Sequence, residues 1–180
     1  MRNIIFLFFI ILAITNTAHS KYVRKEWKHW SDRDKNCLNT KEEILKARAK
    51  SIVLTSKKGC RIKSGSWDDY YYPETINDMK QIDVDHLVPL KHAYDTGGAN
   101  WSPEKKEQFA NDPENLVITK KKYNRQKGAK GIDKWLPVNK AFACKYLRDW
   151  VRVKKKYGLI DSESERMTIK ALQGSCEIKS

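Results

Sequence analysis

Three side chains that could together hydrolyse a phosphodiester lie within about 40 residues of one another. Asp85 directly precedes His86, and Asn124 follows in a basic run that ends at Gly128. A neutral imidazole can take a proton from water near neutral pH, and a divalent cation can neutralise the charge that builds on phosphate oxygens. Hard oxygen ligands such as those of Asp85 and Asn124 favour Mg²⁺, or Mn²⁺, over zinc. The pattern therefore predicts His86 as a general base and the other two residues as metal ligands.

Two strands and a helix must position these groups. Residues 82–88 predict a strand, because apolar residues alternate with acidic ones and Pro89 ends the run. Residues 116–119 are mostly β-branched and predict a second strand, which leads directly into a short basic helix that Gly128 ends. Adjacent side chains on a strand point to opposite faces. The carboxylate and the imidazole can therefore serve metal and water separately only if the backbone turns between them.

Helices and irregular segments surround this unit. Apolar spacing, capping residues and glycine stops predict helices over 40–50, 102–111 and 139–157, and a last helix that Ser162 or Ser164 caps and that ends at Gly174. At the first of these, Thr40 and Glu43 have the form of a capping box. Residues 57–73 combine glycines with clustered aromatic residues, which favours an irregular hairpin or loop.

The chain is basic and begins with a segment typical of export. It has 180 residues, with 36 Lys and Arg against 22 Asp and Glu, and a formal charge of +14. An apolar run of about 11 residues is shorter than the roughly 20 that span a bilayer, and small residues precede Lys21 where a signal peptidase cuts. We expect a signal peptide over residues 1–20; a membrane anchor is the alternative. The remaining domain, residues 21–180, carries +13, which favours a polyanionic partner.

All four cysteines lie in the expected mature chain. An even number in an exported protein argues for two disulfides, and three pairings are open. The last two predicted helices form an antiparallel hairpin that would bring Cys144 and Cys176 together, which leaves Cys37 to pair with Cys60. Structural zinc is the weaker alternative, because no Cys-x-x-Cys or His-x-x-x-His spacing occurs. The leader and the cysteines predict a secreted or periplasmic protein.

A series of short motifs runs through residues 21–180. They are Trp30-Ser31-Asp32-Arg33-Asp34, Gly65-Ser66-Trp67, Asp85-His86-Leu87-Val88-Pro89-Leu90, Gly97-Gly98-Ala99, Ala110-Asn111-Asp112, Asn124-Arg125-Gln126-Lys127-Gly128 and Trp135-Leu136-Pro137. This series resembles the HNH nuclease superfamily, whose ββα-metal motif runs strand, loop, strand, helix, with signature positions at His86, Asn115 and Asn124. More closely, the chain resembles small secreted HNH endonucleases related to the C-terminal domains of modification-dependent restriction enzymes.

The resemblance implies a role for each matched residue. It assigns His86 as the general base and Asp85 and Asn124 as metal ligands. It assigns Asn115 as the support of the loop that carries the histidine, through hydrogen bonds from its side chain to the backbone. Because Asn124 stands where other branches carry His, we expect a hydrated Mg²⁺ rather than a tightly held transition metal. The expected fold is a ββα-metal core over about 82–130 within a mainly helical, disulfide-stapled α+β domain, and the expected substrate is DNA or RNA.

Basic residues crowd the helix around Asn124. Arg125 and Lys127 flank the expected metal, so we expect them to contact phosphate; a solvated helix face is the alternative. Asp83 shares a strand face with the proposed carboxylate ligand and is a further candidate for the metal, through water. We interpret His92 as a packing histidine rather than as another ligand.

Two further patterns have both a structural and a functional interpretation. Oxygen-bearing side chains imitate a calcium-binding loop, but Cys37 stands where the sharp turn of such a loop needs glycine. The residues of this imitation are Asp32, Asp34, Asn36 and Glu43. The aromatic side chains of residues 67–72 could stack on bases, but clustered Trp and Tyr are more often part of a core.

The sequence favours a secreted, metal-dependent endonuclease of broad sequence tolerance. One alternative is a non-catalytic basic protein that binds nucleic acid or an anionic envelope polymer, and another is a small cationic toxin that acts on membranes. The intact set of Asp85, His86 and Asn124 argues against the first alternative. The lack of a strongly amphipathic basic helix outside the core argues against the second. We infer no protein partner, and no stable membrane association once the signal peptide is removed.

Overall fold

The structure, a computed structural model, describes residues 21–51 and 53–176. Its helices are α1 (Thr40–Ala47), α2 (Leu90–Asp95), α3 (Pro103–Ala110), α4 (Lys121–Lys127), α5 (Lys140–Tyr157) and α6 (Glu163–Ser175), with short 3₁₀ turns η1 (Arg24–Glu26), η2 (Gly98–Asn100) and η3 (Pro113–Asn115). Its strands are β1 (Leu54–Thr55), β2 (Ile62–Ser64), β3 (Trp67–Asp68), β4 (Thr75–Ile76), β5 (Ile82–His86) and β6 (Leu116–Lys120). The expected signal peptide, residues 1–20, lies outside the described residues. Within them, no helix combines the length and the apolar character that crossing a bilayer requires.

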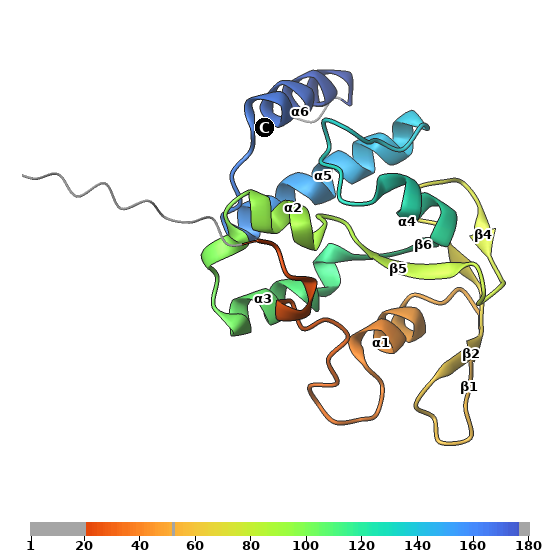
Figure 1. Ribbon diagram of the computed structural model, residues 1–180. Helices are drawn as coiled ribbons and strands as arrows, with labels where there is room; N and C mark the ends of the chain where they lie inside the picture. Colours follow the sequence, from red (N-terminus) through yellow and green to blue (C-terminus); the bar gives the residue numbers. More distant parts are fainter. Residues whose placement is uncertain (1–20, 52, 177–180) are drawn as a thin grey trace, which may run out of the picture.

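The two predicted strands pair at the centre of the molecule. β5 and β6 run antiparallel, with His86 opposite Leu116 at one end and Ile82 opposite Lys120 at the other. α4 follows β6 without a break, and Gly128 ends it at a φ of 56°. Figure 1 shows α4 above this strand pair, α1 below it, α2 and α3 at one end and the small hairpins at the other. The order strand, strand, helix is the predicted one.

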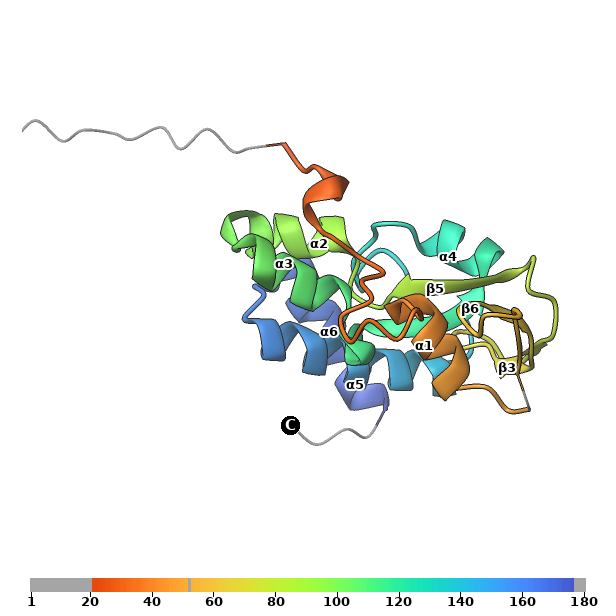
Figure 2. The same cartoon turned by 90° about the horizontal axis from the view of Figure 1, so that it is seen from below.

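β5 ends earlier than the predicted 82–88. Its last residue is His86, because the backbone of Val88 bonds the side chain of Asn115 instead of a neighbouring strand. Residues 87–115 then form a long connection to β6 that contains α2 and α3. Figure 2 shows the two helices of this connection side by side, beyond the end of the strand pair.

Side-chain caps begin most of the predicted helices. Ser102 caps α3, Asn139 caps α5, and Ser162 caps α6 in a capping box with Glu165. The capping box predicted at Thr40 is wrong by one residue. Asn39 caps α1 instead, by accepting from the backbone N–H of Glu42, while the Thr40 hydroxyl donates to the Ser31 carbonyl oxygen. The competing partner of Thr40 comes from a distant loop, which local spacing does not reveal.

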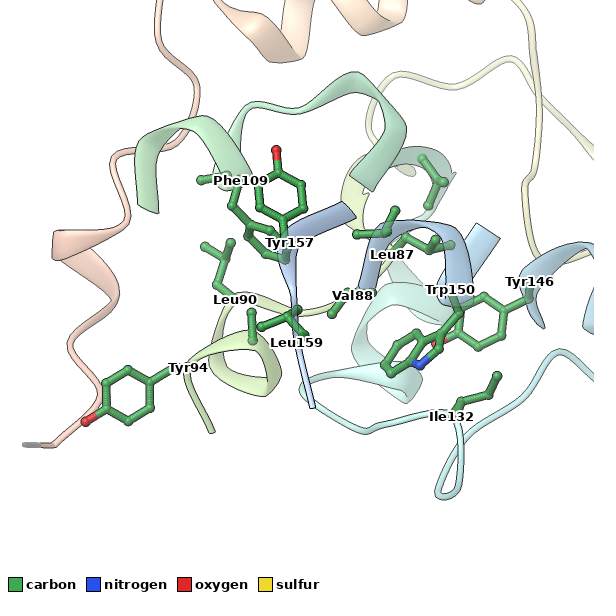
Figure 3. Packing of buried hydrophobic residues seen from close by; sticks show 14 of the residues in the cluster. Leu87, Val88, Leu90, Tyr94, Phe109, Ile132, Tyr146, Trp150, Tyr157 and Leu159 are labelled. Carbon is green, nitrogen blue, oxygen red and sulfur yellow. The ribbon is translucent and has the colours of Figure 1, made fainter. Parts of the chain in front are cut away.

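Two hydrophobic clusters lie on either side of the strand pair. One contains Ile82 and Val84 of β5 together with residues of α1, β2 and β6. The other is built on the apolar stripe of α5, as predicted, and Figure 3 shows Tyr146 and Trp150 of this stripe beside Ile132. Burial on both faces fixes β5 within the fold. The strand therefore presents its remaining polar side chains at a defined position.

The aromatic residues of segment 67–72 serve mainly as core. Trp67 and Tyr71 are fully buried, and Trp67 Nε1 donates to the Leu45 carbonyl oxygen at 2.7 Å. Tyr72 stacks on Tyr123 of α4 with ring centroids 3.6 Å apart. The structural interpretation of this cluster therefore holds for the two buried rings.

Both predicted disulfides are present. Cys37 is bonded to Cys60, and Cys144 is bonded to Cys176 across the hairpin of α5 and α6. The described cysteines leave no free thiol. The predicted fold class, a disulfide-stapled α+β domain around a ββα core, is confirmed.

Candidate active site

The outer edge of β5 borders a cleft of about 430 Å³. In the described chain β5 pairs with β6 alone, so its other edge is available to line this space. Four consecutive residues, 83–86, border the cleft, as does Asn124 of α4. The backbone does not turn between Asp85 and His86, since both pair regularly with β6. Their side chains leave opposite faces of the strand and still reach one cleft, because the cleft lies along the strand edge.

His86 is oriented by the backbone of a distant helix. The side chain is buried, and Nε2 lies 2.8 Å from the carbonyl oxygen of Ala110 at the end of α3. A carbonyl oxygen only accepts, so Nε2 carries the ring proton and Nδ1 keeps its lone pair. Burial lowers the pKa of His86 to about 3, which makes the ring neutral at physiological pH. This is the charge state and the tautomer that a base acting through Nδ1 needs.

Trp30 covers the imidazole. The two rings are stacked, with centroids 5.5 Å apart and planes 29° from parallel. Trp30 has a φ of 62°, an unfavourable conformation for a bulky residue. The neighbouring Ser31 holds the segment in place, because its backbone N–H donates to Asn111 Oδ1 at 2.9 Å. A strained residue fixed over His86 excludes solvent from the ring and contributes to its burial.

Asp85 is held from inside the protein. The Lys127 ammonium lies 2.8 Å from Oδ2, and the Tyr71 hydroxyl donates to the same oxygen at 2.7 Å. Lys127 also donates to the carbonyl oxygen of His86 at 2.8 Å. Burial raises the pKa of Asp85 and lowers that of Lys127, and the attraction between the two charges opposes both shifts. Since both contacts use Oδ2, Oδ1 is the oxygen that Asp85 offers to the cleft.

Asn115 clamps the loop that follows the histidine. It is completely buried; Oδ1 accepts from the Val88 backbone N–H at 2.8 Å, and Nδ2 donates to the Val88 carbonyl oxygen at 3.3 Å. The Leu87 backbone N–H donates to the carbonyl oxygen of Asn115 at 2.7 Å. These are bonds of the kind that the HNH resemblance implies for this position.

Asn124 is paired with a neighbouring carboxylate. Its Nδ2 donates to Asp83 Oδ2 at 2.7 Å, and Asp83 Oδ1 lies 3.5 Å from the ammonium of Lys41. A carboxylate only accepts, so the amide of Asn124 must turn its nitrogen to Asp83. The amide oxygen Oδ1 is thereby left for a ligand. Asp83 therefore orients Asn124, which is a different role from the water-mediated contact with metal that its strand face predicts.

The two basic residues expected to touch phosphate lie on different sides of α4. Arg125 is exposed, beside Lys80 and Lys121. Lys127 is fully buried and its ammonium is bonded to Asp85 and to the backbone. The phosphate contact expected of Lys127 is therefore not available in this structure, because its charge points inward and is already paired.

Hard oxygen donors gather at the cleft. Within the described residues, no three His, Cys, Asp or Glu side chains are placed to hold a metal ion together. Mg²⁺ commonly binds one or two carboxylates and keeps several water ligands. Asp85 with the amide oxygen of Asn124 fits that pattern and lacks the nitrogen and sulfur ligands of a structural zinc site. The residues present suit a hydrated Mg²⁺ or Mn²⁺.

Comparison with known proteins assigns the chain to a family. The family of the C-terminal domain of the GmrSD restriction endonucleases matches residues 39–169, which include β5, β6 and α4. The chain belongs to this family. An "Uncharacterized secreted protein" from Arthroderma benhamiae is 31% identical over 157 residues, which cover 86% of this chain and 76% of that relative. No solved structure gives a significant match. The predicted relationship to restriction enzyme C-terminal domains is thus confirmed.

The sequence does not predict other parts of this candidate site. Arg24 and Trp30 border the cleft. Both precede residue 39, where the match to the family begins. For Tyr71 the sequence offers a place in the core or stacking on bases, and nothing in its local sequence indicates a carboxylate partner. A signal for Lys127 did exist: it follows Asn124 by three residues in a helix, so both side chains share one face. The same reasoning places Arg125 on another side of α4.

The side chains of the segment that resembles a calcium-binding loop bond to that segment itself. Asp32 accepts from the backbone N–H groups of Asn36 and Cys37 at 3.1 and 3.0 Å. Asn36 in turn donates from its side chain to Asp34 and to Glu43. The oxygens that calcium would need are thus engaged in holding a tight turn next to the Cys37–Cys60 disulfide.

Proposed function

We propose that this protein is a secreted, metal-dependent endonuclease that hydrolyses phosphodiester bonds of DNA, with RNA as a second candidate substrate, and with little sequence preference. The orientation of His86 carries the proposal. Its neutral ring bears the proton on Nε2 and borders a cleft that also holds Asp85 and Asn124. Membership of the GmrSD C-terminal domain family supports a nuclease.

His86 acts as the general base in the proposed reaction. Nδ1 accepts a proton from water, the water oxygen attacks phosphorus, the bond from phosphorus to the leaving oxygen breaks, and the leaving oxygen takes a proton from solvent. The bond from Nε2 to the Ala110 carbonyl holds the ring in line during this transfer. A phosphate beside the ring raises the pKa of His86 above its value in the free protein, which strengthens the base when substrate is bound.

Asp85 and Asn124 are the residues that would hold a divalent cation. A cation there would neutralise the charge that builds on the phosphate and on the leaving oxygen. The chain fixes both donors in advance, since Lys127 and Tyr71 hold Asp85 and Asp83 orients Asn124. These contacts hold the two oxygen donors in position before a cation binds.

Arg24 replaces Lys127 as the phosphate contact in the cleft. The Lys and Arg residues that line the cleft are Arg24 and Lys91. Lys91 is paired with Asp95 at 2.6 Å, whereas no carboxylate of the described chain lies within ion-pairing distance of Arg24. A guanidinium can bind phosphate through two parallel N–H groups. Arg125, which is exposed on α4, remains the second proposed phosphate contact.

Several observations support secretion. The sequence predicts a signal peptide over residues 1–20, and the mature chain contains two disulfides, which persist in oxidising compartments. The relative from Arthroderma benhamiae carries the description "secreted". We therefore place the mature protein outside the cytosol, either secreted or periplasmic.

Digestion of supercoiled plasmid by residues 21–180 tests the proposal. With Mg²⁺ or Mn²⁺ we expect nicked, then linear, then fragmented DNA, and with chelator we expect intact plasmid. Asp85→Asn should need more Mg²⁺ for the same rate, because Lys127 and Tyr71 keep the amide oxygen on the inner side and turn the amide nitrogen, which cannot bind a cation, to the cleft. Asp85→Ala is a poorer probe, since it leaves Lys127 buried without its partner. If the wild type cuts neither DNA nor RNA with any divalent ion, a non-catalytic binding protein takes the place of the nuclease.

Binding should depend on phosphate rather than on sequence. The catalytically silent His86→Ala protein should bind unrelated duplexes with similar affinity, and the affinity should fall steeply as salt rises. Fluorescence anisotropy with several duplexes measures both. Affinity for one sequence about a thousandfold above the others would contradict broad tolerance.

A further inference from the structure

A basic hairpin outside the cleft has no part in the chemistry described so far. Residues 54–64, the basic arm, contain β1, its turn and β2, and in Figure 1 they extend from the lower right of the domain. The segment has four cations and no acidic residue. These cations are Lys57, Lys58, Arg61 and Lys63, all exposed. Since no acid within the arm balances them, their charge is available to a polyanion.

The basic arm is fixed to the body of the protein at several points. The Cys37–Cys60 disulfide ties it to the loop before α1, and the Ile62 backbone N–H donates to Glu42 Oε2 at 2.5 Å. The Ile62 side chain is 2% exposed and packs in the cluster that contains Ile44. A fixed arm loses little conformational freedom when it binds. The backbone that carries its cations is therefore fixed relative to α1.

A hollow lined by basic residues connects the arm to the rest of the protein. Arg61 and Lys63 border it from the arm, Lys41 from α1 and Lys121 from α4. Glu42 is the acid among its lining residues, and it accepts the Ile62 backbone N–H. Positive charge thus continues from the arm to the start of α4.

The same hollow leads to the cleft. Lys41 is paired with Asp83, and the other carboxylate oxygen of Asp83 accepts from Asn124. Asp83 and Asn124 both line the cleft that holds His86. Two side-chain contacts therefore separate the basic hollow from the residues of the proposed metal site.

We propose that the basic arm binds the phosphate backbone of the nucleic acid substrate on one side of the scissile bond. Lys121 continues the track from the arm to α4, whose Asn124 lines the cleft. This inference rests on the proposed nuclease function and adds to it a binding surface outside the cleft. The contact is to phosphate, so it contributes affinity without sequence preference.

Removal of the arm's charge is the direct test. The variant carries Gln in place of Lys57, Lys58, Arg61 and Lys63, in the His86→Ala background and with chelator. We expect the slope of log affinity against log salt for a duplex to become shallower by up to about 3.6, at roughly 0.9 for each of the four cations removed, and affinity in 0.1 M salt to fall at least about tenfold.

A matched control separates the arm from net charge. It replaces four other exposed cations by Gln, on α5 and α6: Lys140, Arg148, Lys155 and Lys170. This change removes the same charge and should alter the slope by less than 1. Equal losses in the two variants would overturn the proposal, because net charge alone would then explain them. Thermal melts of both variants check that the fold is kept.

Two further readouts identify the partner and separate this proposal from the nuclease proposal. If the arm variant loses affinity for dextran sulfate but not for duplex, the arm serves another polyanion and the proposal is wrong. With wild-type His86, the arm variant should raise KM for plasmid and leave hydrolysis of bis(p-nitrophenyl) phosphate unchanged, because that small substrate occupies only the cleft. A wild type that hydrolyses neither substrate would end the nuclease proposal, while the binding data would still decide on the arm.

Discussion

In the described chain, two largely buried groups each combine a histidine, a carboxylate and a lysine, and the group that contains His86 borders the cleft described above. The second group lies between α2, α5 and α6. His92 Nε2 is 3.0 Å from Glu165 Oε1, and Lys154 donates to the same oxygen at 3.0 Å. Trp150 packs against the ring of His92, with centroids 5.0 Å apart. On another side lies Gly131, where an added Cβ would be 2.8 Å from Cε1 and 3.3 Å from Nδ1 of His92.

The surroundings of the second ring nitrogen distinguish the two groups. The imidazole of His92 bonds its carboxylate directly, and Gly131 lies so close to the ring that an added Cβ would be 3.3 Å from Nδ1. His86 instead bonds the carbonyl of Ala110, and its ring borders the cleft. Residues of the same types therefore connect helices in one place and form a candidate catalytic site in the other. The packing role interpreted for His92 agrees with this structure.

Replacement of each histidine should give the largest contrast. His86→Ala should reduce cleavage by roughly 10²- to 10⁴-fold, because a positioned base is lost, and should keep DNA binding. His92→Ala should cleave within a few-fold of wild type but melt at a lower temperature, since Glu165 loses a bonding partner. Initial rates on plasmid and thermal melts measure both effects. Cleavage by His86→Ala at the wild-type rate would remove His86 from the mechanism.

Replacement of each lysine by Met should destabilise the fold in both places. Lys127→Met and Lys154→Met each leave a buried carboxylate without its cation, which costs about 3–5 kcal/mol. Only Lys127→Met should also suppress cleavage, because Asp85 then takes up a proton and loses its charge. Urea unfolding and plasmid digestion test this. If Lys154→Met lost as much activity per folded molecule, the two groups would not be functionally distinct.

Acid should weaken the two groups in different pH ranges. The pKa of His86 is lowered to about 3, so the unfolded chain binds a proton first, near pH 6.5. Its stabilisation is complete above pH 6.5 and is lost as pH falls toward 3, by at most about 5 kcal/mol. Burial alone would raise the pKa of Glu165, but hydrogen bonds from His92, Ser162 and Lys154 lower it to about 2. Its stabilisation is present above about pH 4.5 and is lost below that value.

Urea unfolding between pH 7 and 3 separates these contributions. His86→Asn should remove the pH dependence of stability between 6.5 and 5, and Glu165→Gln should change it only below about 4.5. For the same reason kcat/KM of the wild type should show no step near pH 6.5, since His86 of the free protein is already neutral there. A step at that pH which disappears in His92→Ala would transfer the base assignment to the second group.

The smallest expected effect comes from the glycine that covers His92. Gly131→Ala places a Cβ against the ring and should destabilise by about 1–3 kcal/mol with activity unchanged. Gly174→Ala is the control, because nothing lies within 4 Å of its added Cβ and alanine favours the helix. Thermal melts compare the two. A loss of cleavage in Gly131→Ala would mean that the α2–α6 contact also positions the cleft.

Local patterns predicted most of the fold. Ser102, Asn139 and Ser162 act as caps because a capping bond needs only a few neighbouring residues. The stripe of α5 and the hairpin that brings Cys144 to Cys176 follow from helical spacing in the same way. The cap of α1 was misplaced because the Thr40 hydroxyl bonds Ser31, a partner outside the helix.

The site required contacts that spacing does not encode. Asp85, His86 and Asn124 border one cleft, as their chemistry suggested. The carbonyl of Ala110 that sets the tautomer of His86 is a backbone atom and leaves no signal in residue type. Lys127 points inward because of its angular position around α4. That position is overlooked when the basic residues of the helix are treated as one group.

The length of the connection between β5 and β6 sets when the site can exist during folding. Residues 87–115 separate the strands, so their pairing closes a loop of about 30 residues, which costs chain entropy and slows folding. Asn115 bonds Val88 across the two ends of that loop, and those bonds form only once it has closed. In the unfolded chain Asn124 lies far on average from the neighbouring pair Asp85 and His86. A chain kept unfolded for export would therefore cross the membrane without an assembled site.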